Sequence, residues 1–408
     1  MADVTNHRVV VTGLGAVSSI GIGVDAFTES VRQGHTGTSP ITGFDTTGFP
    51  YVVAGEVADF EPATVLEQLN TDQWGRSGLF AASAARLAVR DSGLDPEQLT
   101  ASAAGSIMGT TSGESMVIQD LTEQWVRDGL DSIDPDLVAR APASQIANAV
   151  NSELGLTGDA QTIATACSAS NYSIGYAYDL VRTGEADFML AGGADSVNRY
   201  THAGFYRLGA LAEQVCRPFD KDRSGILTAE GGVTLLLEPL DHAVERGAPI
   251  YAEVLGYGVN CDANHMVHPH PARIAECIRL AQRNAGVRPE QVDYICAHGT
   301  GTPTNDSTEV TAVRDVFGER PPPISSIKSV IGHTMGAASG FGALTCCKAL
   351  DDGFLPPTAN LTHVDEEFGP DLDCVPGTAR DAEPEVVQNH GFAFGGNNAI
   401  TIFGRVDQ

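Results

Sequence analysis

The sequence predicts an α/β fold built from two copies of one unit, because the same order of features occurs twice. A small-residue helix start at Cys167 is followed by Gly184, and a second such start at Gly336 is followed by Gly353 at the same separation of seventeen residues. Each start is preceded by a strand with a Gly-Thr pair and followed by a strand with a Gly-Gly pair. If both units are layered and pack about a pseudo-twofold axis, the two helix starts are neighbours.

Composition favours a compact globular enzyme. The chain has 408 residues, 42% of them hydrophobic, with 45 glycines and only 19% charged residues. The sequence shows no apolar run of about twenty residues and no signal-peptide core, so we expect a soluble, cytoplasmic protein without membrane contact. A net charge of −28 argues against nucleic-acid binding, because phosphates would be repelled.

The eight cysteines form no CxxC pair and no Cys/His cluster, so we predict neither disulfides nor a zinc site. His265, His268 and His270 form a group with metal-like spacing, but no thiol or carboxylate completes the set. We therefore predict no metal. Linkers are few, and we place the boundary between the halves near residue 250, giving ranges 1–250 and 251–408.

A nucleophile is predicted at Cys167. Residues 161–166 suit a buried strand and residues 168–182 an amphipathic helix, so Cys167 lies at the turn between them. A helix N-terminus favours a thiolate, and a lowered thiol pKa makes a cysteine reactive. The alternative is an ordinary buried cysteine, which is the common case for an isolated thiol.

Two later loops supply partners for this thiol. His298 follows a short buried strand, residues 294–297, in a glycine-rich loop that allows close backbone approach to a ligand. Lys328 and His333 lie in a second loop of the same character. The chain has only three lysines, so a lysine here indicates that a compact ammonium is needed. The pseudo-twofold arrangement would bring His333 and Cys167 into one pocket, although single histidines are more often structural.

Five motifs together resemble the elongating β-ketoacyl-acyl carrier protein synthases. They are TACSAS around Cys167, RPFDKDRSG from Arg217, HGTGTPTND from His298, IKSVIGHTMGAASG from Ile327 and GFAFGGNNA from Gly391. The match spans nearly the whole chain. The resemblance implies the thiolase-type fold, five alternating αβαβα layers from two pseudo-duplicated halves, usually as a dimer.

The resemblance also implies catalytic roles. Cys167 would accept an acyl group from the phosphopantetheine arm of an acyl carrier protein, forming a thioester. His298 and His333 would act as neutral donors to the enolate formed when malonyl-carrier protein loses CO2. Lys328 would order the site, with Glu309 as the acid that pairs with it. A carboxylate partner would solve the burial of an ammonium.

Further positions match the family's substrate-handling residues. The backbone N–H groups of Cys167 and Phe394 match the oxyanion hole, and Thr300 and Thr302 match hydroxyls that bind the pantetheine arm. Phe392 and Phe394 match the aromatic residues of the gate, where alanine stands between them and many relatives have glycine. No bound cofactor is implied, because the carrier protein brings the phosphopantetheine.

The implied partners are an acyl carrier protein and a second subunit, either an identical chain or a homologous chain-length factor. Carrier proteins are acidic, so docking needs a local basic patch. The candidates are Arg207, Arg217, Lys221 and Arg223, with ordinary structural arginines as the alternative. Residues 114–142 are expected to cap the acyl cavity or to contribute to the dimer.

Three functions remain distinct at this point: an active condensing enzyme, a non-catalytic subunit that sets chain length, and a degradative thiolase. The presence of Cys167 argues against the second. The third needs another cysteine near the C-terminal glycine loop, where Phe394 stands instead. For the pathway, the resemblance and the departures from the family pattern, such as the alanine between Phe392 and Phe394, favour a ketosynthase of type II polyketide synthesis. Primary fatty-acid synthesis is the alternative.

Overall fold

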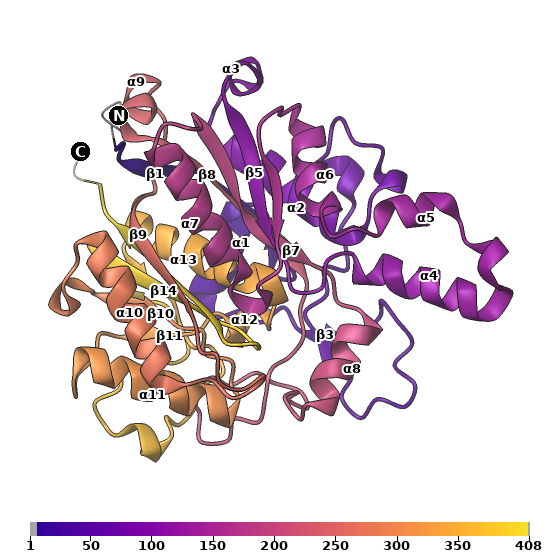
Figure 1. The fold of residues 1–408 in the computed structure, drawn as a ribbon. Coiled ribbons are helices and arrows are strands. Elements are labelled where there is room, and N and C mark those ends of the chain that lie inside the picture. Colours follow the sequence, from indigo (N-terminus) through magenta and orange to yellow (C-terminus); the bar gives the residue numbers. More distant parts are fainter. Residues whose placement is uncertain (1–5, 407–408) are drawn as a thin grey trace.

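The computed structural model describes residues 6–406, which form a layered α/β protein around one mixed sheet (Figure 1). The sheet order is β11-β10-β14-β15-β9-β1-β8-β7-β5-β6, with β2 (Gly21–Ile22) paired to β1. The first half supplies β1 (Val9–Ser18), β5 (Ala104–Gly109), β6 (Ala160–Ile163), β7 (Phe188–Asp195) and β8 (Gly231–Pro239). The second half supplies β9 (Ala252–Cys261), β10 (Tyr294–Cys296), β11 (Ile324–Ser325), β14 (Val386–Phe392) and β15 (Asn397–Gly404).

The helices form three further layers around the two halves of this sheet. One outer face is covered by α2 (Arg76–Asp91) and α6 (Gln145–Leu154), and the opposite outer face by α10 (Pro271–Ala285) and α11 (Pro303–Phe317). Between the sheet halves lie α7 (Ala169–Arg182) and α13 (Ala338–Asp352). The arrangement has the five layers that were predicted. The α/β prediction is therefore confirmed.

The remaining helices and strands lie outside these layers or connect them. They are α1 (Val24–Gln33), α3 (Pro96–Ala101), α4 (Ser115–Asp128), α5 (Pro135–Arg140), α8 (Arg199–Arg207), α9 (Leu240–Glu245), α12 (Lys328–Ile331), and the strand pairs β3 (Ser39–Pro40) with β4 (Val53–Ala54) and β12 (Phe354–Leu355) with β13 (Arg380–Asp381).

The two central helices begin in the same way, as the repeated sequence order predicts. Each follows a single 3-10 turn, Ala166–Ser168 before α7 and Met335–Ala337 before α13. The first residue of each turn has a left-handed backbone, with φ of 52° and 54°. Ser170 Oγ donates a hydrogen bond of 2.6 Å to the carbonyl of Gly336, so the two helix starts are neighbours.

The strand before Cys167 differs from the prediction. It covers Ala160–Ile163 rather than residues 161–166, and its residues are mostly half-exposed rather than buried. The reason is its position, because β6 is the last strand of the sheet and pairs only with β5. One long side of β6 therefore has no neighbouring strand within residues 6–406.

The segment from α4 to α5 extends away from the layered body (Figure 1). Several of its apolar side chains are exposed, namely Ile118, Trp125, Val126, Leu130 and Val138. Such a set of exposed apolar residues is typical of a contact surface. In the part of the chain that is described, no helix has the length and apolar character needed to cross a membrane.

Candidate active site

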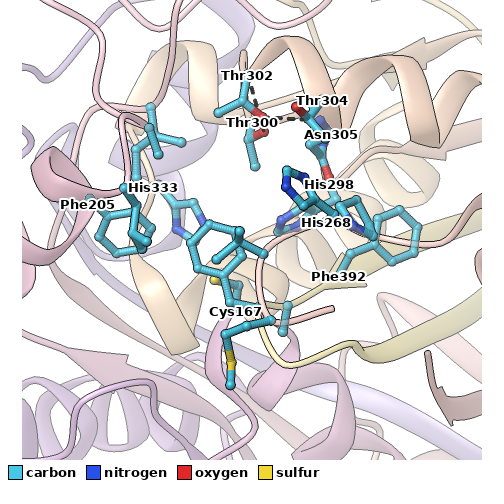
Figure 2. A pocket seen from close by; sticks show the side chains of 18 of the residues that line it. Cys167, Phe205, His268, His298, Thr300, Thr302, Thr304, Asn305, His333 and Phe392 are labelled. Carbon is cyan, nitrogen blue, oxygen red and sulfur yellow. Dashed lines mark hydrogen bonds between the residues drawn. The ribbon is translucent and has the colours of Figure 1, made fainter. Parts of the chain in front are cut away.

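A cavity of about 320 Å³ collects the residues that the sequence analysis singled out. Cys167, His298 and His333 line it together, although they come from three separate segments of the chain (Figure 2). Thr300, Thr302, Phe392 and Phe394 line the same cavity. The prediction that His333 and Cys167 share one pocket is therefore confirmed.

Cys167 lies at the start of the central helix layer, directly after the left-handed Ala166. Its side chain is buried, and the backbone N–H groups of Cys167 itself and of Phe394 both favour its thiolate. Two N–H groups directed at one reacting centre are the arrangement required of an oxyanion hole.

The expectation of a lowered thiol pKa is wrong for the resting enzyme. Burial raises the pKa of Cys167 to about 12, and the carboxylate of Asp195 adds to the increase. Lys328 and the two N–H groups lower it, but they do not offset the loss of water around the sulfur. Cys167 is therefore a protonated thiol at neutral pH until a substrate or a base alters its surroundings.

His298 and His333 face one another across the cavity, with ring centroids 5.7 Å apart. Burial and the nearby Lys328 ammonium hold the pKa of both rings well below the usual value, so both are neutral. The Nδ1 atom of His333 accepts a 3.0 Å hydrogen bond from the Met335 N–H. A neutral ring that accepts at Nδ1 carries its proton on Nε2, so Nε2 is the hydrogen-bond donor of His333.

The predicted pairing of Lys328 with Glu309 is wrong as a direct contact. No carboxylate of residues 6–406 lies within 4.0 Å of the ammonium; Lys328 Nζ instead donates to the His298 carbonyl at 2.5 Å. The two oxygens of Glu309 accept from the N–H groups of His298 at 2.9 Å and Gly299 at 2.8 Å. Both charged groups thus hold the backbone of His298 from opposite sides.

Burial is the main influence on the charge of this lysine. It lowers the pKa of Lys328, while Cys296 and then Glu309 act in the opposite direction. The attraction between the ammonium and Glu309 is therefore real but acts without contact. The sequence could not show this, because the backbone groups of residue 298 occupy the space between the two ions only after folding.

The two aromatic residues of the C-terminal glycine loop have different positions. Phe392 is buried at the end of β14, with its ring centroid 5.6 Å from that of His298. Phe394 is half-buried and stacks on Phe205 of α8 at 5.7 Å. Phe205 and Phe394 thus form a stacked aromatic pair, and no sequence motif indicated Phe205.

A second cavity, about 790 Å³ in volume, adjoins the first, and the stacked pair of Phe205 and Phe394 lies between the two. Cys167, Phe205 and Phe394 line both cavities, so the sulfur is adjacent to each of them. The walls of the second cavity come from α4 and α8. Five residues of α4, from Ser115 to Glu123, therefore line a cavity next to Cys167, whereas residues 124–142, which were included in the same prediction, do not line it.

The loop between β10 and α11 shapes the wall of the first cavity. The Oγ1 atoms of Thr300 and Thr302 are 2.8 Å apart, and Thr302 also caps α11. The buried carboxylate of Asp306 accepts from the N–H groups of Thr300 and Gly301 at 3.0 and 3.2 Å. This carboxylate was not indicated by the sequence analysis, although it lies inside the HGTGTPTND motif.

The four candidate docking residues do not share one environment. Arg207 and Lys221 are exposed and Arg217 is half-buried, so these three are accessible. The side chain of Arg223 is only 4% exposed and ion-pairs with Asp365 at 2.5 Å. The prediction that Arg223 docks a carrier protein is therefore wrong, because its guanidinium is used inside the protein.

His265 and His268 line the mouth of the first cavity, with ring centroids 4.4 Å apart. Among the described residues, no group of three His, Cys, Asp or Glu side chains could hold a metal ion. All eight cysteines are free thiols.

Comparison with known proteins assigns the family. The model of the β-ketoacyl synthase N-terminal domain matches residues 6–243, and that of the C-terminal domain matches residues 251–362. The 3-oxoacyl-[acyl-carrier-protein] synthase 2 of Coxiella burnetii is 36% identical over 411 residues, which covers 98% of this chain and 99% of that protein.

Solved structures agree with this assignment. The ishigamide ketosynthase/chain length factor is 48% identical with a TM-score of 0.96, covering 98% of this chain and 100% of that one. A type II polyketide ketosynthase, solved with its acyl-carrier protein and bound to a hexaketide, is 29% identical with a TM-score of 0.90 and the same coverage. The thiolase-type fold and the prediction of a condensing enzyme are confirmed. The chain therefore belongs to the β-ketoacyl synthase family, as a 3-oxoacyl-acyl carrier protein synthase that acts as an acyltransferase.

Proposed function

We propose that this enzyme extends an acyl chain held on Cys167 by decarboxylative condensation with malonyl-acyl carrier protein. The observation that carries the proposal is one cavity in which a thiol, two backbone N–H groups and two neutral imidazoles meet. A thiol alone supports acyl transfer, whereas neutral imidazole donors beside it support a developing enolate.

In the first half-reaction, the sulfur of Cys167 attacks the acyl thioester and the phosphopantetheine thiol leaves. The oxyanion of this step is held by the N–H groups of Cys167 and Phe394. Since the thiol is protonated at rest, its proton must leave as the new bond forms, and the departing phosphopantetheine sulfur takes it up and is released as a free thiol.

In the second half-reaction, malonyl-carrier protein loses CO2 and its electron pair moves to the adjacent carbon. His298 and His333 donate hydrogen bonds to the enolate oxygen, and the carbon attacks the acyl carbonyl on Cys167. The thiolate then leaves and regains a proton. Thr300 and Thr302 line the first cavity, and their hydroxyl groups are the proposed partners of the pantetheine arm.

The acyl chain would occupy the second cavity, with Phe394 moving aside to admit it. Hydroxyl and amide side chains from α4, including Gln119 and Thr122, stand among the apolar walls there. Such a lining suits a chain that retains oxygen or double bonds better than a fully saturated one. This favours a polyketide over a fatty acyl product.

A homologous subunit is proposed as the partner. The free side of β6 offers unpaired backbone groups, and α4 and α5 carry exposed apolar residues on a segment that extends away from the layered body (Figure 1). An edge strand of this kind is a template for pairing with another chain. The similarity to a ketosynthase/chain length factor structure supports a heterodimer, with a homodimer as the alternative.

The second partner is the acyl carrier protein, for which Arg207, Arg217 and Lys221 remain the docking candidates. A cytoplasmic location stays a prediction. The runner-up function is primary fatty-acid synthesis, which uses the same half-reactions and differs in the acyl chain accepted.

Intact-mass measurement tests the proposal. The wild type and Cys167→Ala are incubated with acyl-carrier protein, alone and with a homologous neighbouring subunit. An acyl mass increment that is absent from Cys167→Ala, followed by a product two carbons longer when malonyl-carrier protein is added, supports the proposal. No increment under any condition would indicate a non-catalytic subunit instead.

A further inference from the structure

His390 is a fully buried histidine that lines neither cavity but contacts Glu309, the carboxylate that holds the backbone of His298. His390 Nδ1 lies 2.9 Å from Glu309 Oε1, and both side chains have 0% exposure. On its other side, His390 Nε2 lies 2.5 Å from Gln388 Nε2. Gln282 Nε2 donates in turn to Gln388 Oε1 at 3.3 Å. These four side chains form one continuous chain of hydrogen bonds from α10 to α11.

The order of donors in this chain identifies the state of His390. An ionised carboxylate can only accept, so Nδ1 of His390 must carry a proton. The Gln388 oxygen accepts from Gln282, which leaves the Gln388 amide nitrogen as a donor toward His390 Nε2. Nε2 is then an acceptor, and His390 is the neutral Nδ1–H tautomer. Every polar atom along this path has a matching partner.

Glu309 connects this histidine to the reaction centre. The same oxygen that accepts from His390 also accepts the His298 N–H, and the second oxygen accepts the Gly299 N–H. A second path runs through Phe392, whose ring centroid is 5.4 Å from His390 and 5.6 Å from His298. His390 thus contacts two of the groups that fix the place of the His298 ring.

The lack of direct contact between Lys328 and Glu309 makes this support necessary. A buried carboxylate whose only anchors were two backbone N–H groups would keep unused lone pairs and could rotate. The His390 N–H removes that freedom from the oxygen nearest His298. A neutral imidazole does this without adding a second buried cation beside Lys328.

We propose that His390 is a positioning residue for condensation: it orients Glu309, which in turn holds His298 where its ring can stabilise the malonyl-derived enolate. This inference rests on the proposed function. His390 reaches neither cavity and touches no substrate. It should therefore affect the malonyl half-reaction and leave acylation of Cys167 nearly unchanged.

Two substitutions of similar polarity separate this role from simple packing. In His390→Asn the amide nitrogen takes the place of Nδ1 and can still donate to Glu309. In His390→Gln the amide oxygen takes the place of Nε2, accepts from the Gln388 amide nitrogen and leaves Glu309 without the donor that Nδ1 supplied. We expect kcat for condensation to fall about 10-fold in His390→Gln, the lower range for loss of a hydrogen-bonded supporting partner, and to stay within about 3-fold in His390→Asn.

The assay follows each half-reaction by mass spectrometry, with acylation measured on Cys167 and CO2 release measured from malonyl-carrier protein. Both variants should be acylated within about 2-fold of the wild-type rate, and thermal unfolding checks that both are folded. Gln388→Met, which releases Nε2 but keeps the imidazole, should give a smaller loss in the same half-reaction.

Equal activity of the Asn and Gln variants, or equal loss of both half-reactions in His390→Gln, would overturn the inference. If His390→Gln fails to fold, an unchanged CO2-release rate in Gln388→Met would overturn it in the same way. Failure of the proposed function looks different, because the wild type itself would then show no acyl increment on Cys167.

Discussion

Replacement of Arg223 by methionine should destabilise the protein and leave its docking surface intact. Arg223 Nη1 donates to the carbonyl of Asp220 at 2.9 Å and pairs with Asp365, and its Nε lies 4.0 Å from the carboxylate of Asp306. The guanidinium also lies over the Phe368 ring, 4.8 Å from its centroid. The change removes the cation and leaves most of the side-chain volume.

The magnitude follows from how deeply each partner is buried. Asp365 is 25% exposed and can be rehydrated, whereas the Asp306 side chain has 0% exposure and cannot. Leaving one buried charge uncompensated costs about 3–5 kcal/mol, and the 4.0 Å separation places this case near 3 kcal/mol. For 408 residues the entropy of unfolding is about 0.9 kcal/mol/K, so Tm should fall by about 3–4 °C.

The loss of folding stability in Arg223→Met should also depend on pH. Burial already raises the pKa of Asp306 to about 6, and Arg223 opposes that increase. Without the guanidinium the folded-state pKa rises further above the unfolded value. A carboxyl group with a raised folded pKa lowers stability as pH rises, so Arg223→Met should lose more at about pH 8 than at about pH 5.5.

Thermal unfolding of wild type, Arg223→Met and Arg207→Met at the two pH values is the measurement. Arg207 is the matched control, because it is exposed and its loss should cost less than about 0.5 kcal/mol. Equal Tm shifts for the two variants, or a shift for Arg223→Met that does not change with pH, would refute the reasoning. A folded Arg223→Met enzyme should keep its apparent affinity for carrier protein.

Three further predictions concern the site itself. Since burial raises the pKa of Cys167 to about 12, its alkylation by iodoacetamide should accelerate about 10-fold per pH unit up to about pH 10, and a plateau near neutral pH would contradict this. Gly336→Ala should lower stability by about 3 kcal/mol, because the new Cβ would lie 2.4 Å from the Thr110 Cα atom; an unchanged Tm would show that the backbone at Thr110 can move away from the turn at Gly336. Ala393→Gly should widen the range of acyl chain lengths accepted, since glycine frees the loop that carries Phe394, and an unchanged product profile would argue against that gate.

Local sequence was enough to determine the elements that carry the chemistry. The strand at residues 294–297, the helix after Cys167 and the repeated helix start at Gly336 each follow from residue pattern and small-residue spacing. The repeat even indicated that His333 and Cys167 would meet, because two similar units packed about an axis bring corresponding points together.

Properties that depend on solvent exclusion or on a distant partner could not be obtained in this way. The thiol of Cys167 has a raised pKa because layers from both halves exclude water from it, which no neighbouring residue reveals. The exposure of β6 depends on which strand ends the sheet.

Charged side chains show the same limit. Arg223 looks like a surface residue in a motif next to Lys221, yet its partners Asp365 and Asp306 lie far away in sequence. Glu309 was assigned to Lys328 but binds the backbone of His298 instead. The sequence by itself determined which residues gather at the site, because local pattern sets the elements and their order. Only the tertiary structure decided which charged group pairs with which partner, because a long side chain can bind any suitable group that folding brings within its reach.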